Sequence, residues 1–221
     1  MENGKVYWSN WSGLSDVSQF IQVQRGLGAS ALGISSVGGT MNMVTKSTEA
    51  QKGGSAYFGI GNDGFRKYSV SFSTGLMDNG WAITFMGSLN TGDGYVKGTN
   101  YEGWTYFGNI SKVINDHHKL SLTAFGAPQW HNQRSTMHYI EDYKNSPDGG
   151  RFNNGYGYIN GEAVGSGYGY NYYHKPQVSL NHYWTIDEKS TLTTSLYGSM
   201  ATGGGRRARG AMSNWLTIDN N

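Results

Sequence analysis

The sequence predicts an all-β protein whose antiparallel strands form a segment of a transmembrane β-barrel. Three observations support this class: apolar and polar side chains alternate with a period of two, turn-forming residues separate the alternating segments, and short connections alternate with long ones. The 221-residue chain contains 34 Gly and 16 Tyr, and only 14% of its residues are charged. No continuous apolar stretch approaches the roughly 18 residues that a membrane helix requires, so a helical membrane protein is excluded.

Composition removes several other classes of protein. The formal net charge of +2 is too small to favour nucleic-acid binding. The chain has no cysteine, which excludes disulfides, a thiol nucleophile and a cysteine-zinc site. The opening residues, MENGKVYWSN, lack the basic start and apolar centre of a signal peptide. We therefore expect either a cytosolic protein or a chain whose true N-terminus lies further upstream.

The alternation predicts seven strands, taken here in chain order. Their expected ranges are 53–61, 65–75, 80–90, 103–113, 119–127, 174–186 and 190–200. Residues such as Asn62-Asp63-Gly64 and Asp78-Asn79-Gly80 lie between them, and these types accept positive φ or close on their own backbone. Neighbouring strands are therefore predicted to pair as antiparallel hairpins.

Each predicted strand has one apolar face and one face of small polar residues. The second strand sets Tyr68, Val70 and Phe72 against Ser69, Ser71 and Ser73. The polar face carries mostly Ser, Thr, Asn and Gly instead of Lys and Glu, which suits a water-lined barrel interior better than a solvated exterior. A soluble β fold is the alternative. We expect the following residues to face lipid: Ile83, Phe85, Leu122 and Leu180. We expect the lumen to be lined by Thr84, Thr123 and Ser179.

The lengths of the connections also point to a membrane barrel. Those at 76–80, 114–118 and 187–189 are short, whereas those at 91–102 and 128–173 are long. Short periplasmic turns and long external loops are typical of outer-membrane barrels. The first turn, at 61–64, is an exception to the alternation. A soluble barrel with two insertions would explain the lengths but not why they alternate.

The segment VQRGLGASALGISSVGGTMNMVTK combines an arginine-glycine pair, a small-residue stretch, a glycine pair and an asparagine in a strand that ends in Thr-Lys. This order resembles the end of the plug domain in TonB-dependent outer-membrane receptors. The matching residues are Arg25, Gly26, Ser30, Gly33, Gly38, Gly39, Asn42, Thr45 and Lys46. Leu27 departs from the family's proline, and the common tyrosine before the glycine is absent. The preceding VYWSNWSGLSDVSQFIQ resembles receptors of the iron-citrate type, so the motif resemblance covers roughly residues 5–46.

The resemblance implies a division of the chain and a function. Residues 1–48 would be the C-terminal part of a plug domain, and residues 49–221 the first strands and loops of a 22-stranded barrel. Contacts between plug and barrel are expected from Arg25, Gly26, Gly38, Gly39 and Asn42. Seven strands would leave an open edge in lipid, and no TonB-box peptide is present, so we expect a fragment or a truncated gene product.

The family takes up ligands across the outer membrane with energy delivered by TonB and its ExbB–ExbD partners, without a bound cofactor. The resemblance therefore implies a receptor, not an enzyme, that lies among outer-membrane lipid and lipopolysaccharide and binds no nucleic acid. A ferric siderophore or an iron-citrate-like chelate is the expected ligand. A structural or adhesive outer-membrane barrel without energy coupling is the alternative, although it would not need the plug-like segment at 20–46.

The long connection at 128–173 holds the candidate ligand-binding residues. It mixes aromatics and cations with Gly and Asn, a composition that suits a polar, anionic chelate. The candidates are Trp130, His131, Arg134, Tyr139, Tyr143 and Arg151. An external loop whose aromatics pack on one another is the alternative.

Other possible chemistry in the chain finds little support. The spacing of His131, His138, Glu141 and Asp142 matches no zinc motif, so no resident metal is expected. No nucleophile elbow or pair of catalytic carboxylates is recognisable. The cluster Arg206-Arg207-Ala208-Arg209 fits a solvated loop, a contact to lipopolysaccharide phosphates or a contact to an anionic ligand.

Overall fold

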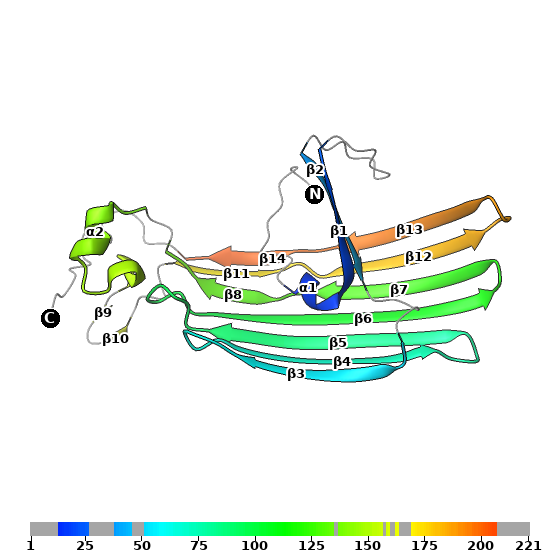
Figure 1. Cartoon of the computed structure of the whole chain (residues 1–221), viewed down its shortest axis with the longest axis horizontal. Helices are drawn as coiled ribbons and strands as arrows, with labels where there is room; N and C mark the ends of the chain where they lie inside the picture. The colour runs from blue at the N-terminus through cyan, green and yellow to red at the C-terminus, as the bar shows by residue number, and fades with distance from the viewer. Residues whose placement is uncertain are drawn as a thin grey trace.

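The computed structural model describes residues 13–26, 38–45, 51–134, 137–156, 158–159, 162–163 and 169–206. Most of these residues form one large antiparallel sheet with long strands, and a small hairpin crosses one of its faces (Figure 1). The motif residues Ser30, Gly33 and Lys46, and the cluster residues 207–209, lie outside the described ranges. No helix in these ranges is long and apolar enough to cross a membrane.

Seven long strands form the large sheet in the order β13-β12-β7-β6-β5-β4-β3. They are β3 (Gly53–Ile60), β4 (Arg66–Leu76), β5 (Trp81–Gly92), β6 (Tyr101–Asn115), β7 (His118–Gly126), β12 (Gln177–Thr185) and β13 (Thr191–Ser199). Every neighbouring pair is antiparallel. Each strand overlaps its predicted range, so the sequence-based prediction of antiparallel hairpins is confirmed.

Three short strands extend the sheet beyond the predicted ends, and this corrects the expectation of one irregular loop at 128–173. The strands β8 (Gln129–Asn132), β11 (Tyr170–His174) and β14 (Thr202–Gly205) continue β7, β12 and β13. Pro128 and Pro176 lie at two of the interruptions. Proline has no N–H to donate to a ladder, so the pairing pauses there and then resumes. The connection that remains between β8 and β11 contains α2 (Ile140–Asn145), the 3₁₀ turn η2 (Gly149–Arg151), β9 (Tyr158–Ile159) and β10 (Glu162–Ala163).

The short turns close through the residues that predicted them. Gly80 adopts φ +77°, and its N–H donates to Met77 O at 2.8 Å. Asn115 Oδ1 accepts from the N–H groups of His117 and His118, both at 2.9 Å. In the last turn the carboxylate of Asp187 accepts hydrogen bonds from the Lys189 N–H and from the Ser190 side chain. These bonds, the first more than the second, lower the pKa of Asp187 below its ordinary value. A carboxylate that accepts its neighbours' donors in this way mimics a backbone turn.

The two faces of the large sheet differ as predicted, and their burial is the reverse of a soluble protein's. Phe85 is 51% exposed, whereas its neighbour Thr84 is 4% exposed. We call the exposed face of the sheet the apolar face. One of its cross-strand rows consists of Ile83, Ile110, Leu122, Leu180 and Leu196. On the opposite, polar face, Asn109 Nδ2 donates to Ser121 Oγ and Thr123 Oγ1, both at 2.8 Å. The predicted separation of faces is therefore confirmed.

The N-terminal elements include a two-stranded sheet that does not pair with the large sheet. A single helical turn, α1 (Leu14–Val17), leads into β1 (Ser18–Arg25), which pairs with β2 (Gly39–Thr45) as a two-stranded sheet. Gly26 and Gly39 have φ values of +77° and +134°, which glycine adopts without strain. A Cβ on Gly39 would also lie 2.4 Å from Gln24 O, so this glycine allows close approach of the two backbones.

Candidate functional site

The polar face of the large sheet carries the N-terminal helical turn. Val17 is completely buried and clusters with three apolar residues of the sheet, Met86, Phe107 and Phe125, and with Ala127, which follows β7. Three of these, Met86, Phe107 and Phe125, occupy one cross-strand row of β5, β6 and β7. This apolar row interrupts a face that otherwise carries Ser, Thr and Asn. The sequence contained a signal for it, because these three residues break the alternation at positions predicted to be polar.

An ion pair lies beside this apolar row. Asp16 Oδ1 contacts Lys67 Nζ of β4, and Ser88 Oγ of β5 donates to Asp16 Oδ2 at 2.9 Å. The Asp16 side chain is only 12% exposed. A carboxylate withdrawn from water in this way loses hydration, and the ammonium group and the hydroxyl donor of the sheet replace those lost contacts.

The hairpin residues predicted to contact a barrel lie away from this interface. Arg25, Gly26, Gly38 and Asn42 are exposed, and Asn42 Nδ2 donates within the hairpin to Gln22 Oε1 at 3.0 Å. Gly39 pairs with Arg25 across the hairpin. Their role in holding the plug stays a prediction. Sequence reasoning missed Asp16 and Val17, because no local pattern marks a contact to residues 51 to 110 positions away.

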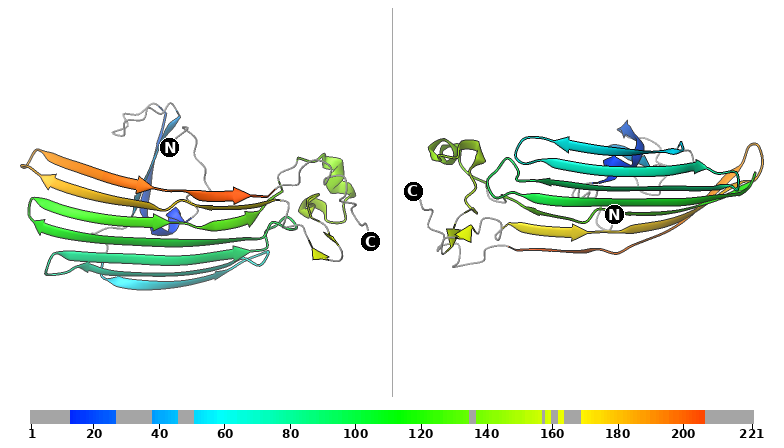
Figure 2. Two further views of the ribbon diagram at one scale, coloured as in Figure 1. Left: turned by 180° about the vertical axis from the view of Figure 1, so that it is seen from behind. Right: turned by 90° about the horizontal axis from the view of Figure 1, so that it is seen from below.

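Three connections at one end of the strands pack into a single folded unit, which we call the loop platform (residues 61–65, 93–100, 133–134 and 137–156) (Figures 1 and 2). Arg151 joins all three parts: NH1 lies 2.7 Å from Asp63 Oδ1 and donates to Tyr95 O at 3.2 Å, and the guanidinium stacks 4.8 Å from the Tyr95 ring centre. Lys97 Nζ lies 2.6 Å from Asp148 Oδ1, and Asn153 Nδ2 donates to Lys97 O at 2.7 Å. These contacts order the connections that the sequence alone predicts as loops.

An aromatic cluster supports the part of the platform around α2. Phe152 packs edge-on against the rings of His138 and Tyr143, at centroid distances of 5.1 and 6.4 Å. Arg134 stacks over Tyr143 at 5.1 Å and donates from NH1 to Phe152 O at 2.7 Å. No carboxylate is recorded beside Arg134 among the described residues, so its positive charge is held by a carbonyl and a ring.

The six predicted ligand-binding residues are distributed over three places. Trp130 lies in the same cross-strand row as Tyr172, on the apolar face, with its ring 6.1 Å from that of Tyr170. His131 is on the opposite face, hydrogen-bonded to Gln129 Oε1 at 3.0 Å. The platform brings together Arg134, Tyr143 and Arg151 and leaves Tyr139 82% exposed. The platform partners Tyr95, Lys97 and Phe152 were not predicted, since they act through long-range contacts.

The histidine and carboxylate residues considered for a metal site are separated. His131 belongs to β8, whereas His138 lies 3.9 Å from Asp142 at the start of α2. Over the ranges that the structure describes, no group of three His, Asp or Glu side chains is placed to hold a metal ion.

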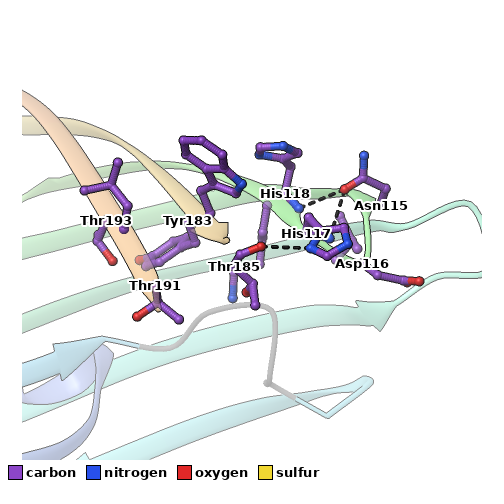
Figure 3. Close-up of a pocket in the computed structure, with 12 residues that line it drawn as sticks. Asn115, Asp116, His117, His118, Tyr183, Thr185, Thr191 and Thr193 are labelled. Carbon is purple, nitrogen blue, oxygen red and sulfur yellow. Dashed lines mark hydrogen bonds between the residues drawn. The ribbon is translucent and has the colours of Figure 1, made fainter. Parts of the chain in front are cut away.

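A cavity of about 440 Å³ lies at the opposite end of the strands, between the β6–β7 turn and the β12–β13 hairpin (Figure 3). His117 Nδ1 donates to Thr185 O at 2.8 Å across it, and Lys119 Nζ lies 4.8 Å above the Tyr183 ring. Nearby, His118 Nδ1 and His182 Nε2 are 3.0 Å apart and share one hydrogen bond. The cavity walls come from two hairpins and combine polar side chains such as Asp116 with apolar ones such as Trp184 and Leu192.

Comparison with solved structures identifies similar sheets in two receptors. The ferric-catecholate import receptor Fiu from E. coli K12, in its open form, matches with a TM-score of 0.67 and 15% identity, over 85% of this chain and 29% of the receptor. The siderophore receptor PiuA from Acinetobacter baumannii matches with a TM-score of 0.61 and 15% identity, over 85% of this chain and 26% of the receptor. The chain thus spans less than a third of either receptor, and at this identity the likeness establishes the fold.

No family model matches the sequence. No curated protein matches it either.

Proposed function

We propose that this chain is part of an outer-membrane receptor of the TonB-dependent class, which captures a ligand outside the cell and admits it across the outer membrane. The observation that carries this proposal is the sheet with an exposed apolar face, whose polar face is occupied by the preceding N-terminal segment. A soluble protein buries its apolar face, and a simple structural barrel does not need a segment docked inside. The likeness to two import receptors supports the same class.

In this proposal the apolar face contacts lipid and the polar face lines the lumen. Residues 1–48 belong to the plug and residues 49–221 to the barrel. The strand edges β3 and β13 pair with further strands, since unpaired backbone groups in hydrocarbon cost several kcal/mol each. The loop platform then lies on the outer surface, because the plug enters from the periplasm and β3 is the first strand to rise outward.

The ligand class proposed is an anionic metal chelate, such as a ferric siderophore or ferric citrate. Arg134 supports this class, because its guanidinium is positioned by a ring and a carbonyl and no carboxylate of the described residues pairs with it. Planar guanidinium groups hold carboxylate or catecholate oxygens through paired hydrogen bonds. Uptake draws its energy from TonB with ExbB–ExbD, as the family resemblance implies, and the surrounding lipid includes lipopolysaccharide.

This function is tested by growing a strain that lacks the gene on a panel of limiting nutrients: ferric chelates, cobalamin and glycans. We expect loss of growth on at least one ferric chelate, reproduced by deletion of TonB and restored by the intact gene. Normal growth on every metal chelate would contradict the proposal. Loss of surface adhesion with normal growth would favour the structural or adhesive alternative.

A further inference from the structure

We propose that Gly13–Val17 is an anchor that docks at a preformed site on the polar face of β4–β7 and keeps the N-terminal segment seated against the sheet. Three chemically different contacts fall within these five residues. Gly13 lies on Thr105, Asp16 pairs with Lys67, and Val17 covers the apolar row. The docking itself follows from these contacts, whereas its setting inside an outer-membrane barrel rests on the proposed function.

The apolar row is the main reason why this site needs a segment to cover it. Met86, Phe107 and Phe125 are at most 6% exposed, although they belong to the face that carries hydroxyl and amide groups around them. Without a cover, three large apolar side chains would meet the water that such a polar face attracts. Val17 belongs to the same buried cluster. The row is thus explained by an apolar partner from the N-terminal segment.

The ion pair fixes the orientation of that partner. Asp16 follows Gly13 by three residues and reaches Lys67 and Ser88, which lie on β4 and β5, while Val17 reaches toward β6 and β7. A segment with the opposite direction or a shifted register would place an acidic side chain over the phenylalanines. That arrangement would bury an unpaired charge, which is strongly unfavourable.

Gly13 supplies a steric requirement. An ideal Cβ at this position would lie 1.8 Å from Thr105 Oγ1 and 2.5 Å from Thr105 Cγ2, closer than any real contact. Any other residue would therefore lift the segment from the sheet. The site accordingly selects for a glycine, an aspartate three residues later and a small apolar residue immediately after it.

Photo-crosslinking in the full-length protein in outer membranes tests the docking directly. Phe107→p-benzoylphenylalanine places the reactive group in the apolar row with a shape close to the native one. Illumination should link it to the peptide that contains Gly13–Val17, as identified by mass spectrometry. The matched control is Ile110→p-benzoylphenylalanine, on the same strand but on the apolar face. A control yield equal to that at Phe107, or a Phe107 link to any other segment, would overturn the proposal.

Charge exchange then tests the role of the ion pair. We expect Asp16→Lys or Lys67→Asp to lower the crosslink yield at Phe107 roughly fivefold or more, as loss of a charged hydrogen bond predicts. The double exchange, Asp16→Lys with Lys67→Asp, should restore most of the yield. Single variants with full yield, or a double variant no better than the singles, would overturn the assigned pairing. Normal surface levels of the receptor are verified by surface labelling.

A separate pair of variants tests the contact between Gly13 and Thr105. Gly13→Ala should reduce the crosslink, and adding Thr105→Gly should recover it by removing the obstructing side chain. Gly198→Ala on β13 is the control, because a Cβ there meets no atom within 4 Å. Crosslink loss equal in the Gly13 and Gly198 variants would contradict the steric argument. Because none of these measurements involves ligand uptake, they separate failure of the anchor from failure of the proposed function.

Discussion

An arginine placed at Leu180 should destabilise the protein in a bilayer far more than one placed at the adjacent Ser179. Leu180 is 42% exposed and lies in the middle of the apolar row formed with Leu122 and Leu196. Ser179 is the next residue of β12 and points to the polar face, where it pairs with Thr123. The two variants therefore share strand, depth and added side chain, and differ only in the face that receives the charge.

The magnitude rests on the proposed function, in which this row faces lipid between the two ends of the strands. An arginine that faces lipid near the midplane costs about 2–4 kcal/mol, which corresponds to roughly a 30- to 700-fold change in the folding equilibrium. The lumen-facing variant meets water and hydroxyl groups, so its cost should be well under half of this. The assay is denaturant-induced unfolding of the full-length protein in phospholipid vesicles. Equal destabilisation by Leu180→Arg and Ser179→Arg would refute the assignment of the two faces.

Three further predictions concern packing and the loop platform. Gly126→Ala should destabilise the protein by about 0.5–1.5 kcal/mol in the same unfolding assay, because a Cβ there would lie 2.2 Å from Tyr106 Oη, push this side chain aside and break its 2.9 Å hydrogen bond to His174. Gly108→Ala, with no atom within 4 Å, should be close to neutral, and similar losses in both variants would contradict this packing. Arg151→Ala should make the loop platform sensitive to protease on intact cells, because it removes the bridge to Asp63 and Tyr95. The control variant Lys144→Ala on α2 should stay resistant. Resistance of both variants would show that the bridge does not order the platform. Arg134→Ala should weaken the binding of whole cells to the ferric chelate identified by the growth panel by more than about tenfold. Lys144→Ala is again the control. Unchanged affinity of the Arg134 variant at normal surface levels would place ligand binding elsewhere.

The strands and their faces could be predicted because both depend on local patterns. Alternation with a period of two fixes which side chains share a face, and residues such as Asn115 and Gly80 close the turns through their own backbone. The division between Thr84 and Phe85 therefore followed from the sequence alone.

The interruptions and the loops were harder to predict. The alternation on either side of Pro128 and Pro176 is too short to reveal that β8 and β11 resume the pairing. The fold of the loop platform depends on Arg151 reaching residues 56 and 88 positions earlier, which no local pattern encodes. Of the predicted ligand-binding residues, Arg134, Tyr143 and Arg151 lie in the platform and take part in cation–aromatic pairs. Composition alone does not reveal that Trp130 lies on a strand.

Under the proposed function, the two outer strands of the sheet have a consequence for how the protein enters a membrane. Within the described part of the chain, β3 and β13 each pair on one side only. If such an edge moved into hydrocarbon before its next strand was in place, a row of unpaired N–H and C=O groups would move with it. In that setting, insertion and strand pairing should be concerted, with each edge paired or shielded before it loses contact with water. An edge left open in water would instead be a template for strand addition by other chains.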